Sequence, residues 1–269
     1  MWSAGIDIGS HSARAAVFDG QAVRAATGLV SEDDADTAAR SVLGRALAEM
    51  GLGQEAVERV VATGWGRRQV SFAHRASSEL VCASRGARWL VPAAGTVVDI
   101  GAEGCRAMRL RPNGAVEDSA ENSKCASGTG AFIELAALYL KVPLERVGPL
   151  ALAADGRADI SATCAVFAES SIISQIHRGE PVERIAAGVV WSVAIRVTDL
   201  IKRVGVAGQL VLVGGGALNP ALVRAIEDIA GVRPVVPEQP QFATAIGAAL
   251  AGQSREAGRP GPRGSEGAW

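Results

Sequence analysis

The sequence has few aromatic residues, few cysteines and no excess of charge of either sign. Aromatic residues make up 4% of the 269 positions, and cysteine occurs four times. The 27 basic and 28 acidic side chains leave a net charge of −1. Binding to nucleic acid or to an anionic membrane surface depends on a basic excess, which this chain lacks. We therefore expect neither of them as a partner.

Long apolar runs are also missing. No uninterrupted apolar stretch reaches the roughly 18 residues of a membrane-spanning helix, and residues 1–7 lack the basic region and apolar core of a secretory signal. We therefore expect a cytoplasmic protein. With 48% hydrophobic and 20% charged residues, the composition is typical of a globular fold, and the length allows one large domain or two smaller ones.

The four cysteines fall into two groups. In a reducing compartment they do not indicate a disulfide framework, which leaves burial or metal binding. Cys82 lies within a predicted helix and Cys105 at the start of a predicted strand, so we interpret both as core side chains. Cys125 and Cys164 each directly precede a helical pattern, and a helix N-terminus favours the thiolate.

Two interpretations of Cys125 and Cys164 stay open from the residues alone. Buried cysteines without reactivity are the simpler one, because free cysteine behaves as a small hydrophobic residue. The glycines at 128 and 130 support the other, since they let the backbone pass close to a bulky group. A cubane iron–sulfur cluster needs four thiolates, which two protomers related by a two-fold axis would supply.

Two aspartate-glycine turns form an internal repeat. The apolar strand predicted at 4–8 enters the turn around Asp7, and the strand predicted at 96–100 enters a similar turn around Asp99, 92 residues further along. Such turns surround a phosphate with backbone N–H groups, and the aspartate at the entrance holds a magnesium-bound water. A single sequence of this kind can also form a plain β-turn that binds no phosphate. His11 within it can likewise be a solvated side chain without a ligand.

A third glycine turn follows the apolar strand predicted at 210–213. Its glycines, at 214–216, would let an adenine and ribose lie flat against the backbone. Apolar periodicity predicts helices at 34–50, 79–90, 131–140, 182–204, 219–229 and 242–250, and a helix after Cys164. Residues 253–269 are rich in glycine, proline, arginine and glutamate, so we expect a disordered tail.

The order of these three turns resembles the actin, sugar kinase and heat-shock ATPase superfamily. This resemblance implies an α/β fold of two similar domains with ATP and Mg²⁺ in the cleft between them. The predicted division is residues 1–95 for the N-terminal ATPase half and residues 96–252 for the C-terminal half, which carries the cluster cysteines. The nucleotide-binding residues that it implies are Gly9, Ser10, His11, Gly101, Ala102, Gly214, Gly215 and Gly216, with Asp7 and Asp99 in catalytic roles.

The stretches 124–130 and 163–170 resemble the cluster-ligand motifs of a narrower family, the BadF/BadG/BcrA/BcrD-type ATPases. That family comprises ATPase subunits of benzoyl-CoA reductase and activators of 2-hydroxyacyl-CoA dehydratases. The resemblance covers about residues 5–251. It implies a helix-cluster-helix dimer interface, with one [4Fe-4S] cluster bound by Cys125 and Cys164 of both chains.

The resemblance also implies partners. The second chain of the dimer is another copy or a sister ATPase subunit, and an acyl-CoA-reducing or dehydratase enzyme receives the electron. A ferredoxin or flavodoxin supplies it.

The second turn departs from the dehydratase-activator pattern Asp-Ile-Gly-Gly-Gln-Asp. Here the chain reads Ala102-Glu103-Gly104 after Gly101, so the last carboxylate is missing and Glu103 is the candidate replacement for orienting the attacking water. This turn is more similar to the D-type ATPase component of benzoyl-CoA reductase, which favours that assignment. The alternatives are a dehydratase activator, a small-molecule kinase of the amino-sugar type and a structural subunit that does not hydrolyse ATP.

Overall fold

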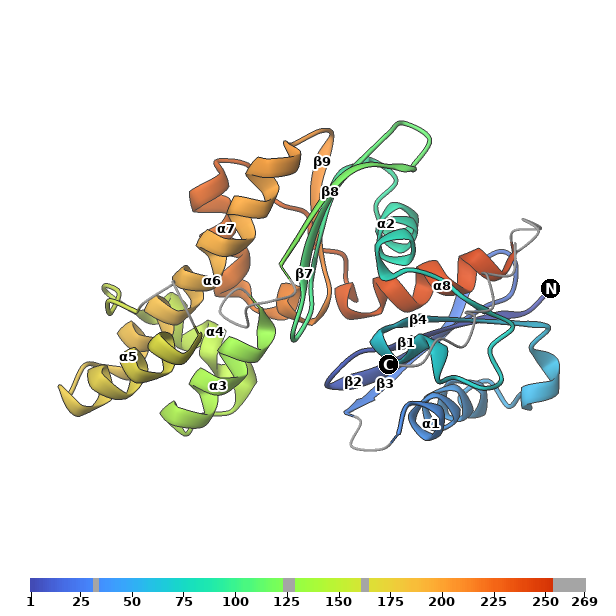
Figure 1. The fold of residues 1–269 in the computed structure, drawn as a ribbon, viewed down its shortest axis with the longest axis horizontal. Coiled ribbons are helices and arrows are strands. Elements are labelled where there is room, and N and C mark those ends of the chain that lie inside the picture. The colour runs from blue at the N-terminus through green and yellow to red at the C-terminus, as the bar shows by residue number, and fades with distance from the viewer. Residues whose placement is uncertain (31–33, 123–128, 161–164, 254–269) are drawn as a thin grey trace, which may run out of the picture.

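The structure, a computed structural model, describes residues 1–30, 34–122, 129–160 and 165–253. Two β-sheets form its framework, with helices around and between them (Figure 1). The first sheet contains β1 (Ser3–Ile8), β2 (Ser12–Phe18), β3 (Val23–Val30), β4 (Arg59–Gly64) and β5 (Arg75–Ala76). The second contains β6 (Ala94–Ile100), β7 (Cys105–Leu110), β8 (Val116–Asn122) and β9 (Gln209–Val213). The helices are α1 (Ala35–Ala48), α2 (Glu79–Leu90), α3 (Gly130–Leu140), α4 (Leu144–Ala153), α5 (Ala165–His177), α6 (Val182–Val204), α7 (Pro220–Ala230) and α8 (Ala243–Gln253).

The two sheets have the same topology. Their strand orders are β3-β2-β1-β4-β5 and β8-β7-β6-β9. In the first sheet, β1 is antiparallel to β2 and parallel to β4. In the second, β6 is antiparallel to β7 and parallel to β9. A parallel bridge between Val211 and Val235 occupies the place that β5 has in the first sheet. The repeat predicted from the two aspartate turns therefore extends through both sheets.

The central strands are buried because helices cover both faces of each sheet. All six residues of β1 are buried, and so are six of the seven residues of β6. On the outer faces, α1 packs against the first sheet, and α6 and α7 pack against the second. Helices α2 and α8 lie between the sheets (Figure 1).

Helix α8 returns to the first sheet from the end of the described chain. Ala245 and Ile246 share a hydrophobic cluster with Ala16 of β2, and the Ser3 hydroxyl donates to the Ala249 carbonyl over 2.8 Å. The two termini of the described fold thus meet on one sheet. The predicted boundary between the two ATPase halves, at residues 95 and 96, divides the chain by sequence order. It stays a prediction.

Helices α2 and α8 contact each other through two glycines. A Cβ at Gly86 would lie 1.8 Å from the Ala243 carbonyl oxygen, and one at Gly247 would lie 1.8 Å from the Cys82 carbonyl oxygen. The two contacts mirror each other, as expected if the repeat relates the helices. Only glycine allows this backbone distance.

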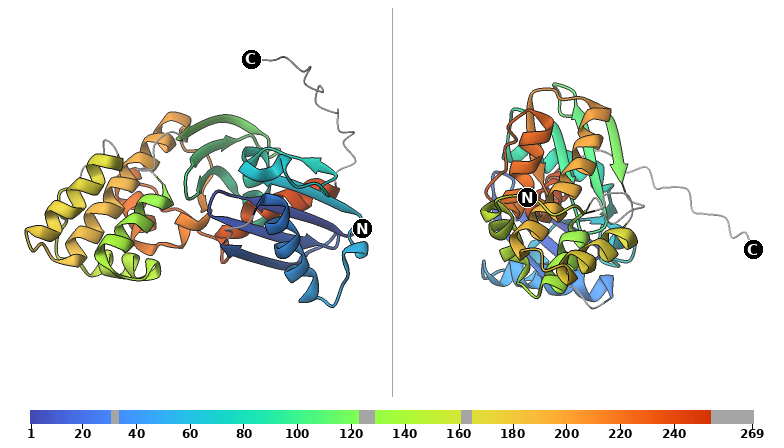
Figure 2. Two further views of the ribbon diagram at one scale, coloured as in Figure 1. Left: turned by 60° about the horizontal axis from the view of Figure 1, so that its bottom comes forward. Right: turned by 90° about the vertical axis from the view of Figure 1, so that its left-hand side faces the viewer.

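The helices α3, α4 and α5 extend away from the second sheet, on the side opposite the first sheet (Figure 2). Cys82 and Cys105 are buried, as predicted. Cys125, Cys164 and the predicted tail from residue 254 lie outside the described residues. None of the described helices combines the length and the apolar character needed to cross a bilayer.

Candidate nucleotide site

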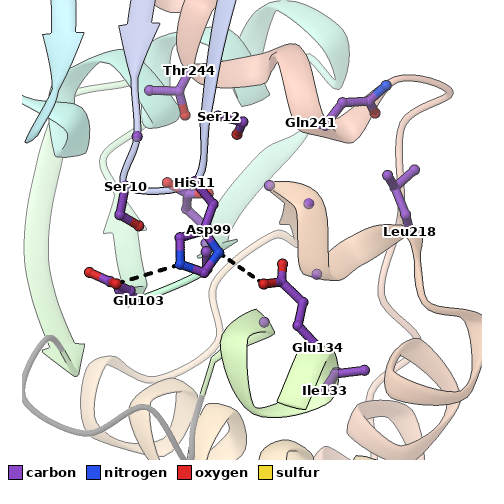
Figure 3. A pocket seen from close by; sticks show the side chains of 18 of the residues that line it. Ser10, His11, Ser12, Asp99, Glu103, Ile133, Glu134, Leu218, Gln241 and Thr244 are labelled. Atoms are coloured by element: carbon purple, nitrogen blue, oxygen red, sulfur yellow. Dashed lines mark hydrogen bonds and ion pairs between the residues drawn. The ribbon is translucent and has the colours of Figure 1, made fainter. Parts of the chain in front are cut away.

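A cavity of about 760 Å³ lies between the two halves of the chain. The β1–β2 turn lines it from the first sheet, and the β6–β7 turn lines it from the second. The glycines 214–216 after β9 and the N-terminal parts of α3, α4 and α7 also line it. Sites for cofactors of nucleotide size fall in this range of volumes. Figure 3 shows the side chains that converge there.

The two aspartate turns have the same geometry. The Gly9 amide donates to the Ser12 carbonyl over 2.9 Å, and the Gly101 amide donates to the Gly104 carbonyl over 2.8 Å. Both hairpins therefore reverse direction in the same way, after a buried strand whose penultimate residue is an aspartate. As a result, Asp7 and Asp99 take equivalent positions on the two sides of the cavity.

A glycine beside each aspartate turn allows the neighbouring strand to approach. Gly64 after β4 has φ +88°, and a Cβ there would lie 2.3 Å from the Ile8 carbonyl oxygen. Gly214 after β9 has φ +84°, and a Cβ there would lie 2.5 Å from both the Asp99 carboxylate and the Ile100 carbonyl oxygen. Both conformations favour glycine. The stretch 64–66 is thus the counterpart of the glycine turn 214–216.

Burial changes the acidity of the two aspartates. Desolvation raises the pKa of Asp7 to about 7, the nearby Arg14 opposes this rise, and the Asp99 charge adds to it. Desolvation likewise raises the pKa of Asp99, against the neighbouring Arg106 and Arg14. A divalent cation between these groups would offset the desolvation and keep the carboxylates ionised. Mg²⁺ usually binds through one or two carboxylates and substrate phosphates, so a pair of acids in a nucleotide cleft fits it.

An arginine stands opposite each aspartate in its hairpin. Asp7 is in register with Arg14, and Asp99 is in register with Arg106. Arg106 is buried and forms an ion pair with Glu79, at the start of α2, over 2.6 Å. Among the described residues, Arg14 has neither a side-chain hydrogen bond nor an ion pair, although it lines the cavity. Its positive charge acts on the carboxylates of Asp7 and Asp99, and at the cavity wall it can also meet an anionic ligand.

His11 connects the first aspartate turn to the second half of the chain. Its Nδ1 lies 2.8 Å from a carboxylate oxygen of Glu134 on α3, and its Nε2 lies 3.6 Å from a carboxylate oxygen of Glu103 in the β6–β7 turn (Figure 3). The imidazole thus stands between two carboxylates. Glu103 is partly exposed and faces His11, so the candidate replacement for the missing carboxylate lies at the cavity wall.

All predicted nucleotide-site residues come together in this one cavity. They are Asp7, Gly9, Ser10, His11, Asp99, Gly101, Ala102, Glu103, Gly214, Gly215 and Gly216. Their roles stay predictions. The two predicted cluster ligands, Cys125 and Cys164, lie outside the described residues. Within the described part of the chain, no group of three or more His, Cys, Asp or Glu side chains is arranged to hold a metal ion.

The sequence interpretation missed several polar residues of the cavity, among them Arg14, Arg106, Glu79 and Glu134. Arg14 and Arg106 could have been found, because each follows its aspartate at the same spacing and the repeat makes that spacing visible. Glu79 begins a helix that was predicted, but its ion pair crosses between the two halves. Glu134 lies on a predicted helix, and nothing in the sequence indicates that it faces His11.

Comparisons with known proteins agree with this architecture. The solved activator of the 2-hydroxyisocaproyl-CoA dehydratase from Clostridium difficile, with bound ADPNP, is 36% identical and superposes with a TM-score of 0.90 over 94% of both chains. The activator of lactoyl-CoA dehydratase from Anaerotignum propionicum is 38% identical over 93% of this chain and 96% of its own length. The D-type component of benzoyl-CoA reductase from Thauera aromatica is 34% identical over 94% of this chain and 93% of its own length.

These similarities confirm the predicted α/β fold with two similar halves around a cleft. They also agree with the predicted family, because dehydratase activators and a benzoyl-CoA reductase component occur among the relatives. The model of that family matches residues 4–252, nearly the whole described fold. The chain therefore belongs to the BadF/BadG/BcrA/BcrD ATPase family.

Proposed function

We propose that this chain is the ATP-hydrolysing component of an electron-transfer system acting on a CoA thioester. The observation that carries the proposal is the cavity, where two equivalent aspartate turns and a glycine turn meet in a member of an ATPase family. The solved relative holds ADPNP. Its similarity over nearly the whole chain supports a nucleotide in the same cleft here.

In this proposal the adenosine lies against the glycines 214–216, and the phosphates extend toward the two aspartate turns. Backbone amides after Asp7 and Asp99 and the guanidinium of Arg14 would bind the phosphates. Asp7 and Asp99 would hold Mg²⁺ through its water shell. Glu103, at the rim of the second turn, would orient the attacking water.

The electron-transfer part rests on the cysteine motifs. Cys125 and Cys164 of two chains would bind one [4Fe-4S] cluster, which supplies the low-potential electron when it is bound. The donor would be a ferredoxin or flavodoxin, and the acceptor a partner enzyme. ATP hydrolysis would change the angle between the two halves and thereby the surroundings of the cluster.

Two partner enzymes fit specific observations. Ala102-Glu103-Gly104 in the second turn favours a benzoyl-CoA reductase-type system, in which the second chain is a sister subunit. The identity of 36–38% to dehydratase activators favours a 2-hydroxyacyl-CoA dehydratase, with a homodimer. Native mass of the chain, alone and when co-produced with a sister subunit, separates the two.

ATP hydrolysis by the anaerobically purified chain, without an added acceptor molecule, tests the proposal. We expect MgATP hydrolysis that Asp7→Asn lowers by at least about tenfold, since a residue acting on the transition state contributes at least this much. The matched control is Asp118→Asn, on the exposed strand β8 away from the cavity, which should leave the rate unchanged. Phosphorylation of an added amino sugar in place of hydrolysis would favour the kinase alternative and contradict the proposal.

A further inference from the structure

Helix α3 is attached to the second aspartate turn by its backbone. The Gly130 amide donates to the Gly101 carbonyl and the Ala131 amide to the Ala102 carbonyl, both over 2.9 Å. A Cβ at Gly130 would lie only 3.2 Å from the Gly101 carbonyl oxygen. The N-terminus of α3 therefore moves with that turn.

The attachment of α3 to the first aspartate turn is of a different kind. It consists of the pair between Glu134 and His11, whose side chains are 39% and 41% exposed. Water and ligands can reach this pair, and exposed ion pairs and hydrogen bonds are weak. His11 itself stands between Glu103 of the second turn and Glu134 of α3, at the wall of the cavity that would hold the phosphates (Figure 3).

The far end of α3 is attached to α5. The hydroxyl of Tyr139 donates a hydrogen bond to the carboxylate of Glu169, and this bond raises the pKa of the tyrosine. Tyr139 is the only tyrosine of the chain. One helix thus connects three places: the second turn through its backbone, the first turn through Glu134, and α5 through Tyr139.

We propose that Glu134 is a positioning residue that senses the terminal phosphate of the nucleotide. Without nucleotide, its carboxylate holds His11. A phosphate at the first turn would take over the imidazole and repel the carboxylate, because both groups are anionic. Helix α3 would then lose its attachment to the first half while it keeps its attachment to the second turn, and Tyr139 would transmit the displacement to α5.

This inference rests on the proposed function, in which the adenosine occupies the glycines 214–216. The terminal phosphate then lies nearest the two aspartate turns. It follows that a triphosphate competes with Glu134 and a diphosphate does not. Glu134 therefore lowers the affinity for ATP relative to ADP, and its release reports which nucleotide is bound.

Titration calorimetry of the full chain with MgAMPPNP and MgADP tests the competition. In Glu134→Gln, we expect the affinity for MgAMPPNP to rise about fivefold relative to that for MgADP, the size of effect typical of a partly exposed polar contact. The matched control is Glu117→Gln, an exposed carboxylate on β8 that does not line the cavity, which should leave the ratio unchanged. An unchanged ratio in Glu134→Gln would overturn the inference.

Amide hydrogen exchange distinguishes phosphate sensing by Glu134 from a purely structural role, which would not make the exchange depend on the nucleotide bound. We expect MgAMPPNP to alter the exchange of α3 and of residues 169–177 in the wild type, whereas MgADP leaves both unaltered. In Tyr139→Phe, which removes only the hydroxyl, α3 should respond and residues 169–177 should not. Equal responses to both nucleotides would contradict the sensing role.

The failure of the proposed function has a separate signature. A wild-type chain that binds neither nucleotide would remove the ATPase proposal, and Glu134 would then have no phosphate to sense. A wild-type chain that binds both, with a ratio that Glu134→Gln leaves unchanged, would remove the sensing role alone.

Discussion

At the scale of single residues, the cleft buries two acidic side chains, and burial disfavours their ionised forms. Asp7 and Asp99 are 9% and 7% exposed, and each has an arginine as its cross-strand neighbour. Nevertheless, desolvation outweighs the arginines and raises both pKa values. A site built in this way stabilises a bound cation, because the cation restores the electrostatic balance that burial removed.

This imbalance predicts a pH dependence of stability. Folding raises the pKa of Asp7 from 3.8 to about 7. Between these values the folded chain holds a proton that the unfolded chain has released, so stability falls as the pH rises through this window. In urea unfolding without ligand, Asp7→Asn should therefore gain about 2–4 kcal/mol relative to the wild type between about pH 4 and pH 7. A stability difference that does not vary with pH would contradict the buried, protonated aspartate.

The ion pair between Arg106 and Glu79 makes a second prediction. Their side chains are 11% and 18% exposed, and they join the second sheet to α2. Glu79→Gln removes the negative charge that compensates the buried guanidinium of Arg106. We therefore expect a loss of about 1–3 kcal/mol in the free energy of unfolding.

A second glutamate gives the control for this measurement. Glu117 pairs with Arg109 over 3.5 Å, and both side chains are more than one third exposed. Glu117→Gln should therefore cost less than about 1 kcal/mol. Equal losses of stability in Glu79→Gln and Glu117→Gln would contradict the expectation that the buried ion pair contributes more than the exposed one.

At the scale of elements, the contact between α2 and α8 decides how the two halves meet. Gly247→Ala would place a methyl group 1.8 Å from the Cys82 carbonyl oxygen, which is backbone and cannot rotate away. We expect a loss of more than about 3 kcal/mol, or separation of the two helices, because overpacking in a core forces backbone shifts. Urea unfolding followed by circular dichroism measures this loss.

The matched control is Gly44→Ala in α1. Gly44 is exposed, and apart from its chain neighbours and the backbone of its own helix, no atom of the described chain lies within 4 Å of a methyl group added there. Alanine has the higher helix propensity, so this variant should gain about 0.5–1 kcal/mol. Loss of stability in Gly44→Ala, or tolerance of Gly247→Ala, would contradict the account of the interhelical contact.

The elements also show what the sequence could and could not predict. Strands β1 and β6 were predictable because they are apolar and end in the same aspartate turn. Helix α4 was not predicted, because Gly148 and Pro149 interrupt its pattern. The structure gives a reason for the glycine, since a Cβ at Gly148 would lie 2.8 Å from Asn219 at the start of α7. Strand β3 is rich in alanine and glycine, so its sequence carries little strand signal.

At the scale of the whole molecule, contacts between distant segments define the site. The cavity combines the first turn, the second turn and the glycines 214–216, which the sequence predicts one by one. The contact of His11 with Glu134 spans 123 positions of the sequence. Such a pairing depends on the position of α3 beside both turns, which no local pattern encodes.

The proposed function requires that two chains share one [4Fe-4S] cluster. The most direct measurement is iron and acid-labile sulfide per chain, together with native mass, on protein purified without oxygen. We expect a dimer with about two irons per chain, as one [4Fe-4S] cluster for two chains requires, and loss of that iron in Cys125→Ser. Protein that is free of iron, both alone and when co-produced with a sister subunit, would contradict it.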